Sequence, residues 1–412
     1  MPNKPTMPNV PNAKWVINLL VFICFMDLFI QLPVMGPLAL SLGASSFQIG
    51  LAVGMYSLTN MIGNMLAGFW IDRYGGKKVL LAGLVSTAGI LLLYTTVRQP
   101  AALLAVRVLH GLAGGLLVPS AFTLVSRAAQ AQAQGRSMAL SGAAVGVAAI
   151  LGPALAGIMK ASAGLDGLFV VASALLFLGG ALVVFGKLRD GRDRPDDQDA
   201  FSISAAQAFM ATLRNEAAAT AYYGAFALMF AMGALTYSLP LKAEALGLPA
   251  QAAGLMLSVF GVVAISLFIL PSNRWFDRVS PLRLCAAGGG IVILSLLALS
   301  MIGQQAGMFA VMAVYGLGFA LLFPSLNALL VGHVRPEHKG KAFGMFYAFF
   351  SLGVVAGSSG LSAFTGDYDL VLRLAAGFLL VSCSGVGIWV IRRRKRESRE
   401  ASPSTNSSFL VK

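Results

Sequence analysis

The sequence predicts an all-α polytopic membrane protein with twelve transmembrane helices, arranged as two parallel, pseudo-symmetric halves of six helices each. Three observations predict this fold class. The 412 residues are 57% hydrophobic and only 11% charged, a composition far from that of a soluble domain. Apolar runs of about 20 residues, the length that crosses a bilayer, alternate with short polar segments. Similar motifs recur at one fixed spacing in the two halves of the chain.

Each long apolar run is interpreted as one membrane-spanning helix, and the charged clusters between the runs as loops in water. The first run is longer than the core of a signal peptide and has no convincing cleavage site after it, so it is kept as a helix. The expected spans are, in order, 15–40, 47–71, 79–97, 101–126, 136–159, 165–186, 221–241, 250–272, 282–302, 307–331, 341–364 and 370–391.

The distribution of positive charge predicts which ends of the helices face the cytoplasm. With both termini in the cytoplasm, most of the 30 Lys and Arg residues fall in cytoplasmic segments. Arg107 falls within a span, and the other exceptions, in loops of the opposite side, are Arg98, Lys160, Lys242 and Arg373. We therefore expect a multi-pass protein of the cell membrane with both termini cytoplasmic. The basic tail after the last span is expected to contact anionic lipids.

The composition and motifs argue against several other classes of protein. The net charge of +14 would suit a nucleic-acid-binding protein, but the basic residues are dispersed among loops, so no nucleic-acid partner is expected. The three cysteines lie in separate predicted spans, which indicates neither a disulfide framework nor a metal site. No phosphate-binding GxxxxGK[ST] loop and no hydrolase or zinc-enzyme motif occurs. We expect that the protein is not an enzyme.

A shift of 205 residues along the chain aligns the two halves with each other. It places Trp70 on Trp275, Asp72 on Asp277, Arg73 on Arg278, Gly111 on Gly316 and Gly152 on Gly357. One offset that explains all these matches indicates two copies in the same orientation. The predicted organisation is a cytoplasmic tail (1–14), a six-helix half (15–186), a cytoplasmic linker (187–220), a second six-helix half (221–391) and a basic cytoplasmic tail (392–412).

The loop after the second span carries a motif. Residues 68–78 read GFWIDRYGGKK, which fits the pattern G-x-x-x-D-R-x-G-x-K-K. This motif, in a chain of two parallel six-helix halves with a long cytoplasmic linker, resembles the major facilitator superfamily of secondary transporters. The resemblance covers nearly the whole chain. It implies that a substrate binds near the midplane between the halves, which rock against each other to expose it to alternate sides.

The resemblance implies a gate in this cytoplasmic loop. Its glycines allow a helix end to pass close to a neighbour and turn. Its aspartate can pair with the adjacent arginine, or with cations and helix N-termini of the other half, and so hold this side closed. The alternative is that the basic residues only enforce orientation. The gating candidates are Gly68, Asp72, Arg73, Gly75, Asp277 and Arg278, and the second copy, which lacks the glycines, predicts a looser latch.

Span 5 contains AAILGPALAG, residues 148–157. This is similar to the GxxxGPxxGG signature of the superfamily's antiporter (drug-efflux) branch, with alanine at two of the glycine positions. Small residues on one face let another helix pack closely, and a proline deletes a backbone hydrogen bond. The resemblance implies a bendable helix and export from the cytoplasm; generic small-residue packing is the alternative. The hinge candidates are Gly142, Gly146, Gly152, Pro153 and Gly157.

Asp27 is the only acidic residue near the middle of a predicted span. An unpaired carboxylate is costly inside a membrane, so we expect Asp27 to bind a proton or to meet a cation, and Arg107 is the predicted cation. We hypothesise that Asp27 carries a coupling proton for which Arg107 or the substrate competes; a purely structural Asp27–Arg107 pair is the alternative. Where relatives usually carry Gln, this chain has His110, which is either a neutral hydrogen-bonding residue or a proton carrier.

Polar and aromatic residues at helical spacing are candidates for a substrate cavity. The polar ones lie in the first half, and the second half supplies aromatic residues whose alternative role is core packing. One acid, one or two bases and an aromatic wall suit a small amphipathic molecule and do not suit a polyanion. The cavity candidates are Gln31, Tyr56, Asn60, Asn64, Tyr237, Tyr315, Phe346, Tyr347 and Phe350.

These observations and the resemblance predict a proton-coupled transporter that exports a small amphipathic or zwitterionic molecule, driven by the proton gradient without a cofactor. A lipophilic drug, a sugar, or a secreted metabolite such as an opine- or siderophore-type metallophore fits this description. An uptake symporter for a sugar or another small solute is the nearest alternative. A membrane sensor that binds its ligand without flux is an alternative from a different class. The chain is expected to act as a monomer.

Overall fold

The computed structural model describes residues 11–128, 134–186, 188, 216–269, 278–333 and 339–400. Most of the predicted linker (187–220) and the gating candidate Asp277 lie outside the described residues. Within the described ranges the chain folds into helices joined by short turns, without strands.

The first half of the chain forms helices that match the first six predicted spans. They are α1 (Pro11–Ile30), α2 (Met35–Ser41), α3 (Ser46–Tyr74), α4 (Gly76–Leu93), the 3-10 turn η1 (Tyr94–Thr96), α5 (Pro100–Gly114), α6 (Leu117–Ala128) and α7 (Gln134–Phe185). The two segments α1 and α2 form one span with a 43° bend between them. The first half of α7 is span 5 and the second half is span 6, because Gly164 adopts φ 71° and reverses the chain.

The second half of the chain repeats this arrangement. Its elements are α9 (Glu216–Ala245), α10 (Ala252–Ile269), α12 (Pro281–Met301), α13 (Gln305–His333), α14 (Lys339–Val355), the π-helical turn η5 (Ala356–Gly360), α15 (Leu361–Phe364) and α16 (Tyr368–Glu400). By length and composition alone, seven of the described helices can cross a membrane, or eight when α1 and α2 count as one span. Each predicted span is matched by a helix, so the predicted fold class of twelve helices is confirmed.

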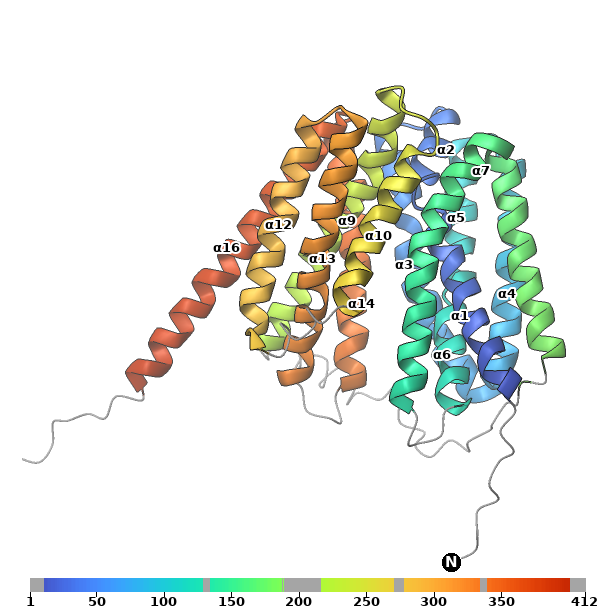
Figure 1. Cartoon of the computed structure of the whole chain (residues 1–412), viewed down its shortest axis with the longest axis horizontal. Helices are drawn as coiled ribbons and strands as arrows, with labels where there is room; N and C mark the ends of the chain where they lie inside the picture. Colours follow the sequence, from blue (N-terminus) through green and yellow to red (C-terminus); the bar gives the residue numbers. More distant parts are fainter. Residues whose placement is uncertain are drawn as a thin grey trace, which may run out of the picture.

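The two six-helix halves stand side by side (Figure 1). The start of α1 and the end of α16 lie at the same end of the bundle, which we call the terminal face; the other end is the opposite face. The turns after α2, η1, α9 and α15 lie at the opposite face. The predicted orientation places the terminal face in the cytoplasm.

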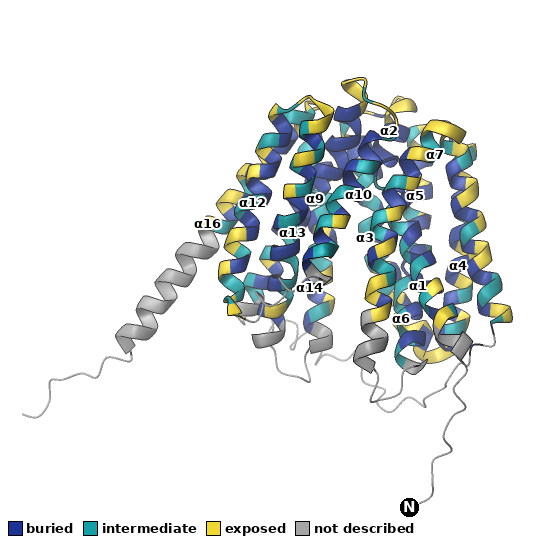
Figure 2. Ribbon diagram, in the orientation of Figure 1, coloured by how far each residue is buried: buried dark blue, intermediate teal, exposed yellow. Residues whose placement is uncertain are grey.

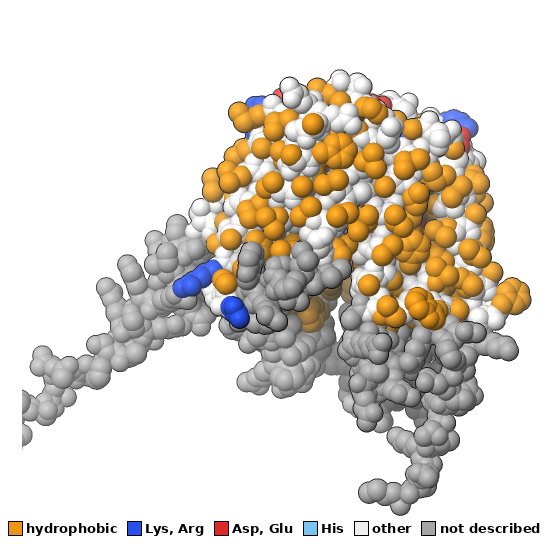
Figure 3. Space-filling view, in the orientation of Figure 1, with side chains coloured by type: hydrophobic (Ala, Val, Ile, Leu, Met, Phe, Trp, Pro, Cys, Tyr) orange, Lys and Arg blue, Asp and Glu red, His pale blue; other side chains and the backbone are white. Residues whose placement is uncertain are grey.

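The described helices bury one side and expose the other (Figure 2). Hydrophobic side chains cover the visible lateral surface, whereas the charged side chains in view lie near the two ends (Figure 3). This distribution is the reverse of that on a soluble protein, because hydrocarbon and not water surrounds the flank of a membrane helix bundle.

The halves pack against each other along two lines of contact, which we call the seam: α7 packs on α10, and α3 packs on α14, η5 and α15. Glycines allow the close approach. A Cβ added to Gly54 of α3 would lie 2.9 Å from the Cα of Val355, and one added to Gly157 of α7 would lie 2.9 Å from the Cα of Gln251. These contacts lie between the opposite face and the middle of the bundle, so the two halves are closed on each other at the opposite face.

Candidate proton-coupling site

Asp27 lies in the packed interior of the first half, surrounded by groups from four helical segments. It comes from the last turns of α1 and is 3% exposed, while His110 of α5 is completely buried. Tyr56 reaches the site from α3, and Tyr94 reaches it from the turn η1. The sequence prediction thus found the buried acid, but the surrounding groups differ in part from those expected.

The nearest base to the Asp27 carboxylate is His110. Its Nε2 lies 3.1 Å from Oδ1 and 3.3 Å from Oδ2 of Asp27. The other ring nitrogen, Nδ1, lies 3.0 Å from the hydroxyl of Tyr94, which is 2% exposed. The tyrosine, the imidazole and the carboxylate therefore form a continuous buried chain of hydrogen bonds.

The expected direct ion pair between Asp27 and Arg107 is wrong. Arg107 is buried, but its guanidinium donates to the side-chain oxygen of Gln31 and to two carbonyls of α3, at 2.6 Å to Ala52 and 3.3 Å to Val53. Because these acceptors occupy the fork of the guanidinium and His110 occupies the carboxylate, the hydrogen bonds between the two charged groups run through Gln31. The Gln31 side-chain nitrogen donates to Asp27 Oδ1 at 3.3 Å.

Three of the cavity candidates form a ladder along α3 that starts at Asp27. The Tyr56 hydroxyl donates to Asp27 Oδ2 at 3.4 Å, Asn60 donates to the Tyr56 oxygen at 3.4 Å, and Asn64 donates to Asn60 Oδ1 at 3.0 Å. The residues are spaced by four and run toward the terminal face, a rise of about 12 Å over eight helical residues. Asn64 Oδ1 is buried and has no partner among the described residues.

Glycines of α5 make this packing possible. A Cβ on Gly111 would collide with Thr59 and with the Tyr56 carbonyl, and one on Gly114 would lie 2.7 Å from the Tyr56 hydroxyl. The Arg107 guanidinium carbon sits 5.0 Å from the centre of the Tyr56 ring, a cation–π distance. Gly111 and Gly114 therefore allow α5 to pack against α3 at the level of the site.

Three of the five hinge candidates, Gly146, Pro153 and Gly157, lie along the seam. Gly152 instead packs against Phe29 and Ile30 of α1 in its own half, and Gly142 has no neighbour within 4 Å. The Pro153 carbonyl packs against Gly254 of α10, and the hydroxyl of Ser258 donates to the Ile150 carbonyl at 2.6 Å. The Gly-Pro helix thus forms one of the two parts that the first half contributes to the seam, and α3 forms the other.

The charged gating candidates that the structure describes form no ion pair with one another. Asp72 and Arg73 are exposed, and neither forms an ion pair with a described residue. Arg73 lies 5.3 Å from the ring centre of Tyr74, Gly75 turns the chain with φ 90°, and Gly68 is in open space. Arg278, also a candidate, is exposed.

An ion pair that the sequence analysis missed joins the halves at the opposite face instead. Lys160 Nζ, near the turn of α7, lies 3.0 Å from Glu244 Oε2 near the end of α9. Both residues stand next to loops, where charges are common, so the pattern of the sequence gave no signal for their pairing. Closure at this face agrees with the lack of an ion pair at Asp72 and Arg73 among the residues described at the other face.

The aromatic candidates of the second half divide into two groups. Tyr237, Tyr315 and Phe346 are completely or almost completely buried within that half. Tyr347 is 49% exposed, and its ring contacts Phe350 edge-on at 5.9 Å. Aromatic spacing alone does not separate these groups, because Phe346 and Tyr347 are neighbours on α14 and yet one is buried and the other exposed.

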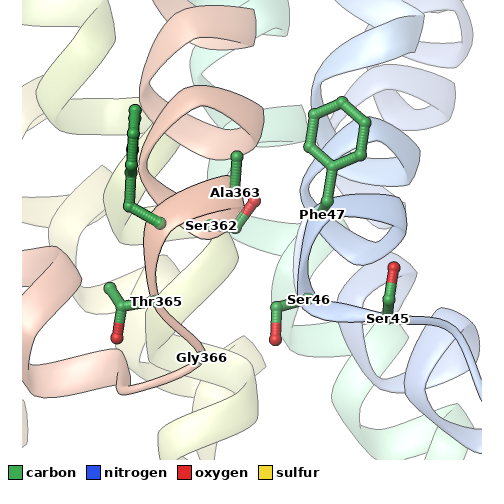
Figure 4. A pocket seen from close by; sticks show the side chains of 8 residues that line it. Ser45, Ser46, Phe47, Ser362, Ala363, Thr365 and Gly366 are labelled. Atoms are coloured by element: carbon green, nitrogen blue, oxygen red, sulfur yellow. The ribbon is translucent and has the colours of Figure 1, made fainter.

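A separate pocket of about 310 Å³ lies on the seam at the opposite face. It separates the start of α3 from the end of α15, and Figure 4 shows the side chains of the two segments on its two sides. It is lined by Ser45, Ser46, Phe47, Ser362, Ala363, Phe364, Thr365 and Gly366, so it contains none of the predicted site residues. It marks the outer end of the closed seam.

The fold and site define a polytopic helical membrane transporter with an ionisable network buried in one of its two halves. The model of the Major Facilitator Superfamily matches residues 17–358 and 221–411. The chain belongs to this superfamily.

Two kinds of relatives are similar to the chain. It is 23% identical over 390 residues to Multidrug resistance protein 2 of Bacillus subtilis (strain 168), an alignment that covers 92% of this chain and 95% of the relative. Among solved structures, a mutant of the nucleoside transporter NupG matches with a TM-score of 0.78 at 17% identity, over 90% of this chain and 98% of that one. A bacterial homolog of the human lysosomal transporter Spinster, inward-facing and unoccupied, matches with a TM-score of 0.76 at 14% identity, over 92% and 96%. At these identities the structures establish the fold.

Proposed function

We propose that this protein is a proton-coupled transporter that exports a small amphipathic or zwitterionic molecule from the cytoplasm by alternating access. The observation that carries the proposal is the burial of the Asp27 carboxylate within the membrane-spanning helices. Its neighbours Gln31, Tyr56 and His110 are all hydrogen-bonding groups that could release the carboxylate to another partner. An intramembrane acid of this kind is a functional site by default, because a merely structural role does not require so costly a group.

The network supplies a way for proton and substrate to exclude each other. Ionised Asp27 accepts hydrogen bonds from Tyr56 and Gln31 and contacts the His110 ring. A cationic or strongly donating group of a substrate would compete for the same carboxylate, and a proton bound within this network would cancel the negative charge that attracts the substrate. A transporter that returns either with a proton or with a substrate, and not with both, is an antiporter driven by the proton gradient.

Two further observations support export. The Gly-Pro helix of the antiporter pattern lies along the seam, where its backbone packs directly on α10. Multidrug resistance proteins are among the relatives that align over most of the chain. Within the proposal, a lipophilic drug and a secreted opine- or siderophore-type metallophore both fit a site with one acid, two bases and a partly exposed aromatic wall. We place the protein in the cell membrane as a monomer, with both termini and the lipid-binding basic tail in the cytoplasm.

A symporter for a sugar or another small solute is the second candidate function. The observation that favours it is the ladder of amide and hydroxyl groups from Tyr56 to Asn64, which resembles a sugar-binding surface more than a lipophilic one. In that case the proton and the substrate bind together and the gradient drives uptake. A sensor would bind the ligand without any flux.

The test uses purified protein in liposomes with an imposed pH gradient. Uptake of tetraphenylphosphonium, sugars and opine-type metallophores is compared in wild type, Asp27→Asn and Asp166→Asn, the last being an exposed acid in the turn of α7. We expect gradient-driven movement opposite to the proton flow, lost at least 100-fold in Asp27→Asn and retained in Asp166→Asn. Substrate movement in the same direction as the protons would indicate a symporter. Substrate flux that is equal with and without the pH gradient would reject proton coupling.

A further inference from the structure

The Tyr94 hydroxyl is a member of the site that no sequence pattern indicated. It stands at the end of α4, in the turn η1, and contacts the ring nitrogen of His110 that faces away from Asp27. We infer that His110 receives the coupling proton, with Asp27 as its counter-ion, and that Tyr94 is a positioning residue that supplies the hydrogen-bond acceptor for the protonated ring. This inference rests on the proposed proton coupling and assigns the proton to a specific atom, Nδ1 of His110.

The geometry holds the imidazole in one orientation. Tyr94 stacks on Phe169 with ring centres 4.5 Å apart and an interplanar angle of 13°. The imidazole meets the ring of Tyr94 edge-on at 5.6 Å and that of Tyr56 edge-on at 5.2 Å. With aromatic rings on two sides and hydrogen bonds at both nitrogens, rotation of the ring would break contacts with Tyr94 and Asp27 at once.

Asp27 lies closest to Nε2 of the ring, with the Gln31 side-chain nitrogen further away at 3.4 Å, and Tyr94 lies at Nδ1. The partners Asp27 and Tyr94 suit both protonation states of the ring. In the neutral state, Nε2–H donates to the Asp27 carboxylate and Nδ1 accepts from the Tyr94 hydroxyl. When a proton binds to Nδ1, this nitrogen becomes a donor, and the Tyr94 oxygen accepts while its own hydrogen rotates away. A hydroxyl can serve in both states because it is both donor and acceptor. A glutamine at this position could not take up the proton, which makes His110→Gln a direct test.

The charges around the ring also favour this assignment. The titratable and charged groups that face it are Asp27 of α1, Tyr56 of α3, Tyr94 of η1 and Arg107 of α5, with Cys24 of α1 beside Asp27. The positive charge of Arg107 opposes a charge on His110, but its guanidinium is held by Gln31 and two backbone carbonyls. The carboxylate of Asp27 contacts the imidazole directly, and since Coulomb energy falls with distance, this attraction is the larger effect.

The experiment follows the protonation of His110 directly, without any substrate. Protein labelled with 15N-histidine is placed in lipid nanodiscs, its imidazole nitrogen signals are followed from pH 5 to pH 9, and the signal of His110 is assigned by its absence in His110→Gln. We expect Tyr94→Phe to weaken proton binding at His110 about tenfold to 100-fold, because the protonated ring then buries a donor without a partner. Asp27→Asn is expected to weaken it at least as much.

A matched control separates this role from a general loss of packing. The hydroxyl of Tyr222, another fully buried tyrosine, has no partner among the described residues, so Tyr222→Phe is expected to leave the His110 titration unchanged. A His110 signal that does not titrate in wild type, or that titrates equally in Tyr94→Phe, would overturn the inference. If His110 titrates as expected while liposomes show no gradient-driven flux, the proposed function fails and the proton site stands.

Proton-driven flux gives a second readout. In the background of His110→Gln, adding Tyr94→Phe is expected to change the pH profile of tetraphenylphosphonium transport less than twofold at any pH, because the partner of the hydroxyl is already absent. A further large shift in this double variant would show that Tyr94 acts on something other than His110 and would reject its positioning role.

Discussion

The two halves of the molecule place different chemistry at the same point of a shared scaffold. The shift of 205 residues that aligns the repeats puts Met232 at the position of Asp27 and Tyr315 at the position of His110. The two pairs also correspond in space: the Tyr315 hydroxyl lies 3.9 Å from the sulfur of Met232, as His110 lies against Asp27. One half therefore holds an ionisable pair where the other holds a thioether and a phenol.

The helix contacts that frame these pairs are repeated more faithfully than the pairs themselves. Gly111 and its counterpart Gly316 both sit where a Cβ would press on the backbone of the neighbouring helix. Gly83 packs on Leu116 and Leu117, and its counterpart Gly288 packs on the corresponding residues of α13. The comparison teaches that close packing is a requirement of the shared fold, while the Asp27–His110 pair belongs to one half and is free to specialise.

The largest expected difference between the halves is at the paired positions themselves. We expect Asp27→Leu to lower proton-driven flux more than 100-fold and to destabilise the protein by roughly 3–5 kcal/mol, since it leaves His110 and Arg107 without their counter-charge. Met232→Leu, a change of similar volume in an apolar site, is expected to cost less than about 1.5 kcal/mol. Thermal unfolding in detergent and liposome flux measure both, and equal losses in the two variants would contradict the comparison.

The scaffold glycines should behave alike in the two halves. Gly111→Ala and Gly316→Ala are each expected to destabilise by about 1–3 kcal/mol, because a methyl group must push apart helices that already touch. Gly89→Ala in α4, where a Cβ meets nothing within 4 Å, is the control and is expected to be neutral or slightly stabilising. The measurement is the thermal unfolding midpoint. A strong effect at one glycine alone would show that the repeat does not extend to packing.

The helices and the buried acid were predictable from the sequence for the same physical reason. Hydrocarbon excludes charge, so apolar runs reveal the spans and a lone carboxylate such as Asp27 is conspicuous. The partner of that acid was not predictable in this way. Arg107 was favoured on charge alone, but the carbonyls of Ala52 and Val53 compete for its guanidinium, and only the packing of α3 on α5 reveals them.

Other parts of the site depend on contacts between residues distant in the chain. Tyr94 stands at the end of an apolar run, where tyrosine is typical of the membrane interface, and its bond to His110 depends on the turn η1. Lys160 and Glu244 are charges beside loops, and their pairing depends on how the halves are rotated at the seam. The sequence could not distinguish the buried aromatic candidates from the exposed one. Helical spacing predicts on which side of a helix a residue lies, but it does not predict what packs against that side.

The ladder on α3 has no counterpart in the second half, where the shift of 205 residues puts Gly261 and Ile265 at the positions of Tyr56 and Asn60. All its hydrogen bonds donate toward Asp27, so they stabilise the ionised carboxylate together. We expect Asn64→Leu to lower proton-driven flux about threefold to tenfold. Thr59→Val, on the same helix but bonded to its own backbone, is the control. A rise in KM without a fall in kcat would instead make Asn64 a substrate contact.

The smallest expected effect concerns the seam, where the halves meet as partners. Lys160 and Glu244 are partly exposed, so their ion pair is worth about 0.2–1 kcal/mol. Breaking it should shift the equilibrium between the closed and the open state of the opposite face by no more than about fivefold.

The opening can be measured with the variant Ser362→Cys, because Ser362 is 2% exposed on the closed seam and a membrane-impermeant maleimide would label the cysteine when the seam opens. Lys160→Glu is expected to speed the labelling, and the exchanged pair Lys160→Glu with Glu244→Lys to restore it. Because a screened ion pair weakens with salt, the difference between these variants should shrink as ionic strength rises, whereas a packing defect at the seam would persist.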